Sequence, residues 1–157
     1  MNWQTVIENP LLQNLPFKVE LNQYGNITMT PASNRHGIIQ IKIGYLLVEK
    51  TKCGQVISEC SVSTSKGVKV ADLAWGSEEF MERNKDETPY KEAPDICVEI
   101  RSPSNTDDEM LEKIDLYLAK GAKEVWISDE SGTITFYSYA GIIKKSNIIP
   151  DFSGKIH

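Results

Sequence analysis

Two acidic residues stand in apolar, strand-like segments of the sequence, where an unpaired charge would be unfavourable. The segment Pro94–Ser104 reads PDICVEIRSPS; its isoleucines and valine alternate to one side, so Glu99 and Arg101 project from the other. Asp72 interrupts the nearly apolar run GVKVADLAW. A buried carboxylate must be paired, protonated or bound to a metal. A solvated sheet face is the alternative for Glu99 and Arg101.

If the two strands are neighbours, Asp72 and Glu99 can reach one divalent cation. Mg²⁺ prefers oxygen ligands, keeps several waters, and needs only one or two carboxylates. Such an ion activates water and neutralises charge on a scissile phosphate. A nearby protein cation would complete the set. Arg101 suits phosphate binding, whereas Lys113, on the flank of the apolar stripe of the next helix, has the more tunable charge. A lysine at a stripe edge can instead extend to water.

The segments around these residues predict two hairpins, two main helices and a later pair of strands. The expected elements are a hairpin of 17–21 and 27–30, a helix over about 35–49, a hairpin of 54–63 and 67–75, a helix after the capping box of Thr106 and Glu109, and strands over 124–129 and 133–139. The strand–helix–strand order from Glu99 to Trp126 predicts two parallel strands joined by a crossover. The fold class is therefore α/β, or mixed α+β, with a central mixed sheet flanked by helices.

Length and composition are those of one soluble globular domain spanning residues 1–157. The three cysteines lack metal-ligand spacing, and Cys60 and Cys97 stand in strand-like runs, which predicts buried thiols in a reducing cytoplasm. No signal peptide or long apolar run is evident, so export and membrane insertion are not expected. The net charge of −5 argues against a surface coated with basic residues for nucleic acid, although bound Mg²⁺ changes the local charge.

Several motifs together resemble a known family. PDICVEIRSPSN, followed by EKIDLYLAKGAKEVWISD, is similar to the restriction-endonuclease family abundant in cyanobacteria. The hairpin FKVELNQYGNITMTPAS, the helix opening at His36, and VADLAW fall in the same order, so the resemblance covers most of the chain. It implies a restriction-endonuclease-like PD-(D/E)XK core.

The resemblance also implies roles for individual residues. Asp72 resembles the first metal-binding aspartate, here preceded by alanine where proline is usual, and Glu99 resembles the acid of the (D/E)XK element. Arg101 stands where the lysine of that element is expected, and Lys113 matches a lysine of the following helix that can replace it. Glu20 matches a recurrent acid of the first hairpin that could join Asp72 and Glu99 as a metal ligand.

Two other polar residues have structural interpretations. Asp95 matches the proline–aspartate pair that opens the strand, and we interpret it chiefly as a strand-start or capping residue. His36 lies in the first turn of its helix, where a surface or capping position is the simplest expectation. Glu20, taken without the resemblance, would be solvated.

The leading hypothesis is a Mg²⁺- or Mn²⁺-dependent endonuclease of DNA, with Asp72 and Glu99 as ligands and Lys113 as catalytic cation. A homodimer is expected by analogy, because cutting both strands requires two active sites. The alternative is a non-catalytic binding or regulatory module on the same scaffold, suggested by Arg101 and the absence of a basic stripe. A hydrolase using Asp95 and Glu99 is disfavoured, since the two lie four residue steps apart on the strand, at a separation of about 13 Å.

Overall fold

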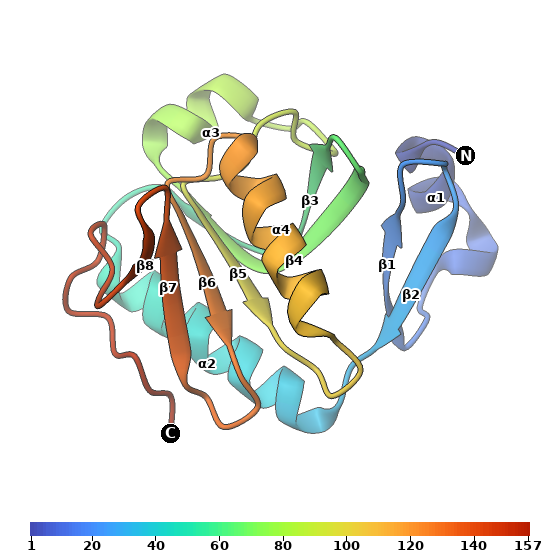
Figure 1. The fold of residues 1–157 in the computed structure, drawn as a ribbon. Helices are drawn as coiled ribbons and strands as arrows, with labels where there is room; N and C mark the ends of the chain where they lie inside the picture. The colour runs from blue at the N-terminus through green and yellow to red at the C-terminus, as the bar shows by residue number, and fades with distance from the viewer.

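The computed structural model describes residues 1–157 and contains a six-stranded mixed sheet at its centre (Figure 1). Across the sheet the strands follow the order β3 (Gln55–Thr64), β4 (Gly67–Gly76), β5 (Ile96–Ile100), β6 (Glu124–Ser128), β7 (Ile134–Ser138) and β8 (Gly141–Ile143). Only β5 and β6 are parallel, with Val98 opposite Trp126, and α4 (Asp107–Ala119) connects them. The predicted mixed sheet and its parallel pair are confirmed.

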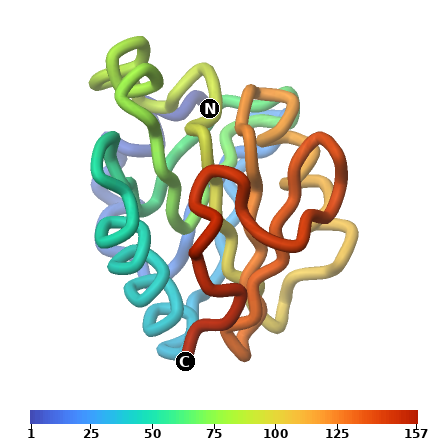
Figure 2. Tube along the Cα trace, turned by 90° about the vertical axis from the view of Figure 1, so that its left-hand side faces the viewer, coloured from blue at the N-terminus to red at the C-terminus, as the bar shows by residue number.

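Helices cover both faces of this sheet (Figure 1). On one face, α2 (Asn34–Lys50) packs its inward stripe against the strands, and the C-terminal segment lies beside it (Figure 2). The apolar cluster on this side comprises Ile39, Ile43, Leu47, Leu73, Trp75, Ile96, Val98, Ile100, Trp126, Ile134, Phe136, Ile149, Phe152 and Ile156. On the other face, α4 and the short α3 (Glu78–Asn84) cover a second cluster that includes Cys60, Val62, Ala71, Ala74, Phe80, Cys97, Ile114 and Tyr117.

The first hairpin forms a separate two-stranded sheet beside β4 (Figure 1). It consists of β1 (Phe17–Leu21) and β2 (Ile27–Pro31), preceded by α1 (Trp3–Glu8) and a 3₁₀ turn at Pro10–Leu12. Leu21 and Val19 belong to a small apolar cluster with Val6 of α1 and Val68 of β4. Because side chains alternate along a strand, the polar residues between them project from the opposite face of β1.

Local signals place the helix ends. Ser33 accepts a hydrogen bond from the amide of His36 (3.1 Å) and so caps α2. Thr106 and Glu109 form the predicted capping box at the start of α4, and Gly121, just beyond its end, has φ +104°, a conformation that favours glycine. None of the helices combines the length and the apolar character that crossing a membrane requires.

Candidate active site

The site lies where β4 and β5 stop pairing. Their backbone register runs from Trp75 opposite Ile96 to Leu73 opposite Val98, and it ends there. Asp72 and Glu99 are the next residues on the two strands. The amide of Ile100 donates to Asp72 Oδ2 (2.7 Å), so a side chain of β4 binds the backbone of β5 at this point. The divergence of the strands opens space for two carboxylates.

A local irregularity in β4 turns Asp72 toward that space. Leu73 packs on the α2 side of the sheet whereas Ala71 packs on the α4 side, although two residues of a regular strand would share a face. The register of β3 and β4 also leaves Glu59 and Asp72 unpaired, and Glu59 has φ +50°, a left-handed value that is unfavourable for a non-glycine residue. The alternation of side chains therefore changes phase at Asp72.

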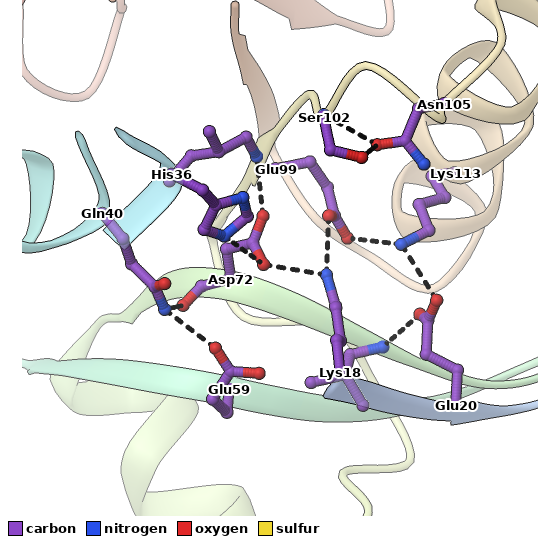
Figure 3. A network of polar contacts seen from close by, with 12 residues as sticks. Lys18, Glu20, His36, Gln40, Glu59, Asp72, Glu99, Ser102, Asn105 and Lys113 are labelled. Atoms are coloured by element: carbon purple, nitrogen blue, oxygen red, sulfur yellow. Dashed lines mark hydrogen bonds and ion pairs between the residues drawn. The ribbon is translucent and has the colours of Figure 1, made fainter. Parts of the chain in front are cut away.

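Lys18 bridges the two buried carboxylates (Figure 3). Its Nζ lies 3.0 Å from Asp72 Oδ1 and 2.9 Å from Glu99 Oε2. Both acidic side chains are only 2% exposed, and that of Lys18 is 11% exposed. Carboxylates from adjacent strands of the main sheet thus converge on one cation that is supplied by the separate hairpin.

A second lysine holds the other oxygen of Glu99 (Figure 3). Lys113 Nζ, from α4, lies 3.1 Å from Glu99 Oε1 and 3.1 Å from Glu20 Oε1. The hydroxyl of Tyr117, one turn further along α4, also donates to Glu99 Oε1 (2.8 Å). The other oxygen of Glu20 accepts from the amide of Val70 in β4 (2.7 Å). Glu20 therefore holds Lys113 and the hairpin in place, and it does not share the cation position between Asp72 and Glu99.

The first two turns of α2 reach Asp72 from the opposite side. His36 Nε2 lies 3.4 Å from Asp72 Oδ1, and His36 Nδ1 is buried without a hydrogen-bond partner. Gln40, one turn later, donates to the backbone carbonyl of Asp72 and to the carboxylate of Glu59, at 2.8 Å in each case. These contacts place His36 in the site, whereas a surface or capping position was expected for it.

Burial and neighbouring charges shift the pKa values of these groups in different directions. Burial opposes ionisation of Asp72, but Lys18, His36 and the amide of Ile100 outweigh it and hold its pKa below the ordinary value. For Glu99 burial prevails over the opposing lysines, and its pKa is raised. Lys18 has a raised pKa because nearby carboxylates overcome the effect of its burial. Asp72 is therefore the more firmly ionised carboxylate.

These groups line a polar cavity of about 640 Å³ between the hairpin, the starts of α2 and α4, and the diverging strands. Six of the lining residues are acidic (Glu20, Glu59, Asp72, Glu99, Glu109, Glu112) and three are lysines (Lys18, Lys69, Lys113). The excess of carboxylates favours bound cations. A phosphodiester could approach the cavity only if added positive charge offset this excess.

The other two residues considered from the sequence lie away from the cavity. Arg101 forms an ion pair with Asp107 at the start of α4 and donates to the carbonyl of Asn105 (3.3 Å). Asp95, before the other end of β5, accepts from the amide of Ser77 (2.8 Å) and pairs with Lys123 (2.9 Å). The structural interpretation of Asp95 is confirmed. Asp72, Glu99, Lys113 and Glu20 are brought together, whereas Arg101 is not.

Lys18 was not expected in the site and His36 was expected at the surface or as a cap, although both residues had detectable signals. Lys18 stands two residues before Glu20, so the alternation of a strand places both on one face. His36 stands three residues before Ile39, on the stripe that α2 turns inward. In both cases the period of the strand or helix showed which residues share a face with Lys18 or His36. The polarity of the two side chains, taken alone, suggested contact with solvent.

The family and the fold of the chain can be compared with those of known proteins. Residues 5–147 match the model of the Uma2 family, which is described as "Putative restriction endonuclease". No curated protein matches the sequence. The chain is also similar to the crystal structure of a putative nuclease belonging to DUF820 from Anabaena variabilis, with a TM-score of 0.66 and 18% identity over 86% of this chain and 73% of the other. The fold is therefore the one seen in that DUF820 protein, and the chain belongs to the Uma2 family of restriction-endonuclease-like proteins.

Proposed function

We propose that this protein is a metal-dependent endonuclease that hydrolyses phosphodiester bonds of DNA. One observation carries the proposal: carboxylate oxygens of Asp72 and Glu99, from adjacent strands, converge on a single cation position in a polar cavity. Membership of the Uma2 family supports the reaction class.

The residues present fit Mg²⁺ or Mn²⁺. No group of three or more histidine, cysteine or acidic side chains forms a ready metal cluster. A hard cation that keeps several waters needs only one or two carboxylates, however, and Asp72 Oδ1 and Glu99 Oε2 supply them. A divalent cation held there would lower the pKa of a bound water and offset negative charge on the scissile phosphate.

The surrounding side chains have distinct tasks in this proposal. Lys113, held by Glu99 and Glu20, is the catalytic cation that positions the attacking water and stabilises charge on the phosphate oxygens. Tyr117 fixes the carboxylate of Glu99, and the amide of Ile100 fixes that of Asp72. Phosphoryl-transfer catalysis consists mainly of positioning and electrostatic stabilisation, so each of these contacts contributes to the rate.

A plasmid-nicking assay with Mg²⁺ or Mn²⁺ tests the proposal. The wild type should cut DNA and lose the activity with EDTA, and Glu99→Gln should be slower by about 100-fold or more. Glu112→Gln is the matched control, because Glu112 lines the same cavity but its carboxylate pairs with Lys66 at the surface; it should cut within about twofold of the wild type. Cleavage that survives EDTA, or that Glu99→Gln leaves unchanged, contradicts the proposal.

A non-catalytic binding or regulatory module is the second candidate, and Lys18 favours it. Its ammonium already satisfies both carboxylates without a metal. A module of this kind would bind neither Mg²⁺ nor Mn²⁺ at Asp72 and Glu99. Calorimetric titration with Mn²⁺, in the presence and absence of a DNA duplex, separates the two candidates, since the endonuclease binds the metal and the module does not.

For the assembly we propose a homodimer that uses the outer face of α2 (Figure 2). Ile38, Ile41, Tyr45 and Val48 are 45–72% exposed and follow a three-four-three spacing, which forms one apolar stripe. An antiparallel second copy would pair Ile38 with Val48 and Ile41 with Tyr45. Light scattering should give twice the chain mass for the wild type and the chain mass for Ile41→Glu. A monomeric wild type contradicts this assembly.

A further inference from the structure

We propose that Lys18 is a displaceable internal counter-ion: in the metal-free protein its ammonium occupies the cation position between Asp72 and Glu99, and a divalent cation binds there only when Lys18 swings into the cavity. The inference rests on the proposed metal-dependent function and adds a resident competitor to it. It predicts that the chain's own lysine weakens metal binding.

The geometry makes the two cations mutually exclusive. Lys18 Nζ lies 3.0 Å from Asp72 Oδ1 and 2.9 Å from Glu99 Oε2, on the oxygens that a metal would take. Mg²⁺ binds oxygen at about 2.0–2.1 Å, so the carboxylates would close around the smaller ion in the volume that the ammonium occupies. An ammonium left in contact would add strong like-charge repulsion. Binding of the metal therefore requires Lys18 to leave.

The metal-free site needs the charge of Lys18. Asp72 and Glu99 are almost fully buried, and two uncompensated carboxylates in one buried site are strongly unfavourable. Lys113 neutralises only one side, because it contacts Glu99 Oε1 and Glu20 Oε1 but not Asp72. Lys18 is the one ammonium that touches both acids. It thus compensates the charge of both buried carboxylates when no metal is bound.

The structure gives Lys18 a route out. The backbone of Lys18 stays paired with Thr30 in the hairpin, so only its flexible side chain must rotate. The side chain borders the 640 Å³ cavity, where Thr28 and Thr30 of β2 also lie. Glu20 continues to bind Val70 and Lys113, which fixes the hairpin while Lys18 moves. After the exchange the ammonium faces the space in which a phosphodiester would approach.

The experiment is calorimetric titration of Mn²⁺ into the wild type, Lys18→Met and Lys69→Met at one pH and ionic strength. Lys69→Met is the matched control, because Lys69 lines the same cavity without an ion pair to either acid. We expect Lys18→Met to bind Mn²⁺ at least about tenfold more tightly than the wild type, and Lys69→Met to change the affinity by less than about threefold. Without metal, Lys18→Met should also melt at a lower temperature than the wild type. Added Mn²⁺ should raise the melting temperature of Lys18→Met by more than it raises that of the wild type.

Equal or weaker Mn²⁺ binding by Lys18→Met overturns the inference and leaves the proposed endonuclease intact. If neither the wild type nor Lys18→Met binds Mn²⁺, the metal-dependent function fails and the inference fails with it. Lys18→Gln keeps the test decisive if Lys18→Met does not fold without metal, because glutamine removes the charge but retains a hydrogen-bond donor for the carboxylates. Circular dichroism checks the fold of each variant.

Discussion

Glu20 and Val70 join the hairpin to the main sheet. The carboxylate of Glu20 in β1 accepts a 2.7 Å hydrogen bond from the backbone amide of Val70 in β4, and both residues are buried. Val70 lies outside the part of β4 that pairs with β5. On this edge of β4 the carboxylate of Glu20 therefore accepts the hydrogen bond that a neighbouring strand would otherwise accept. It thereby fixes the hairpin that carries Lys18 over the site.

Substitution of Glu20 should therefore cost stability. Glu20→Ala leaves the buried amide of Val70 without an acceptor, and we expect the free energy of unfolding in urea to fall by about 1–3 kcal/mol. Glu20→Gln keeps an oxygen for the amide but loses the charge that faces Lys113, and it should cost less. Hydrogen exchange at Val70 should accelerate in Glu20→Ala. Slow exchange there in both variants would show that the bond does not hold the hairpin.

The hydroxyl of Tyr117 stabilises the ionised form of Glu99 by a 2.8 Å hydrogen bond. Tyr117→Phe should lower the free energy of unfolding at neutral pH by about 2 kcal/mol. Since burial already raises the pKa of Glu99 above 4.5, loss of the donor raises it further, and the deficit should shrink as the carboxyl protonates in acid. Urea denaturation at several pH values measures the deficit. Tyr137→Phe is the control, because Tyr137 is half-buried on β7 outside the cavity. If Tyr137→Phe lowers the free energy of unfolding as much as Tyr117→Phe does, the hydrogen bond to Glu99 is not the cause of the loss.

His36 should make the metal-free protein more stable on the acid side of neutrality. Its hydrogen bond to Asp72 raises the pKa of the imidazole above 6.5. A pKa raised by folding contributes stability that is complete below pH 6.5 and is lost as the pH rises through the folded value. NMR titration of the imidazole should show the raised pKa, and Asp72→Asn should lower it. The variant His36→Gln identifies the NMR signal of this imidazole by its loss. If the pKa of His36 is unchanged in Asp72→Asn, Asp72 is not the cause of its increase.

The three cysteines should differ in reactivity. Cys53 is exposed, whereas Cys60 and Cys97 are buried in the sheet, as the sequence predicted. Burial raises the pKa of Cys60 to about 12 and that of Cys97 well above its ordinary value, so neither forms a thiolate near neutral pH. A thiol reagent at pH 8 should modify one cysteine per folded chain and three after unfolding. Cys53→Ser should abolish the rapid reaction, and rapid modification of a second thiol would contradict the buried sheet.

Elements whose signals are local could be predicted from the residues alone. The alternation around Glu99 identified β5 and the face on which its acid lies, and Thr106 with Glu109 marked the start of α4. The order of strand, helix and strand then implied the parallel pair. These features follow from the periods of strands and helices and from backbone hydrogen bonds within a few residues, which a linear sequence displays directly.

How the site is completed depends on contacts that form only in the folded chain. Apart from the family resemblance, which suggested Glu20 for the site, Lys18 and Glu20 read as the polar face of an ordinary hairpin, because alternation states which residues share a face but not what that face meets. The phase change at Asp72 coincides with the left-handed backbone of Glu59 in the neighbouring strand. Arg101 follows β5 immediately, yet the turn after the strand directs it to Asp107. Each outcome depends on contacts between residues far apart in the sequence or on one loop conformation, and local periodicity encodes neither.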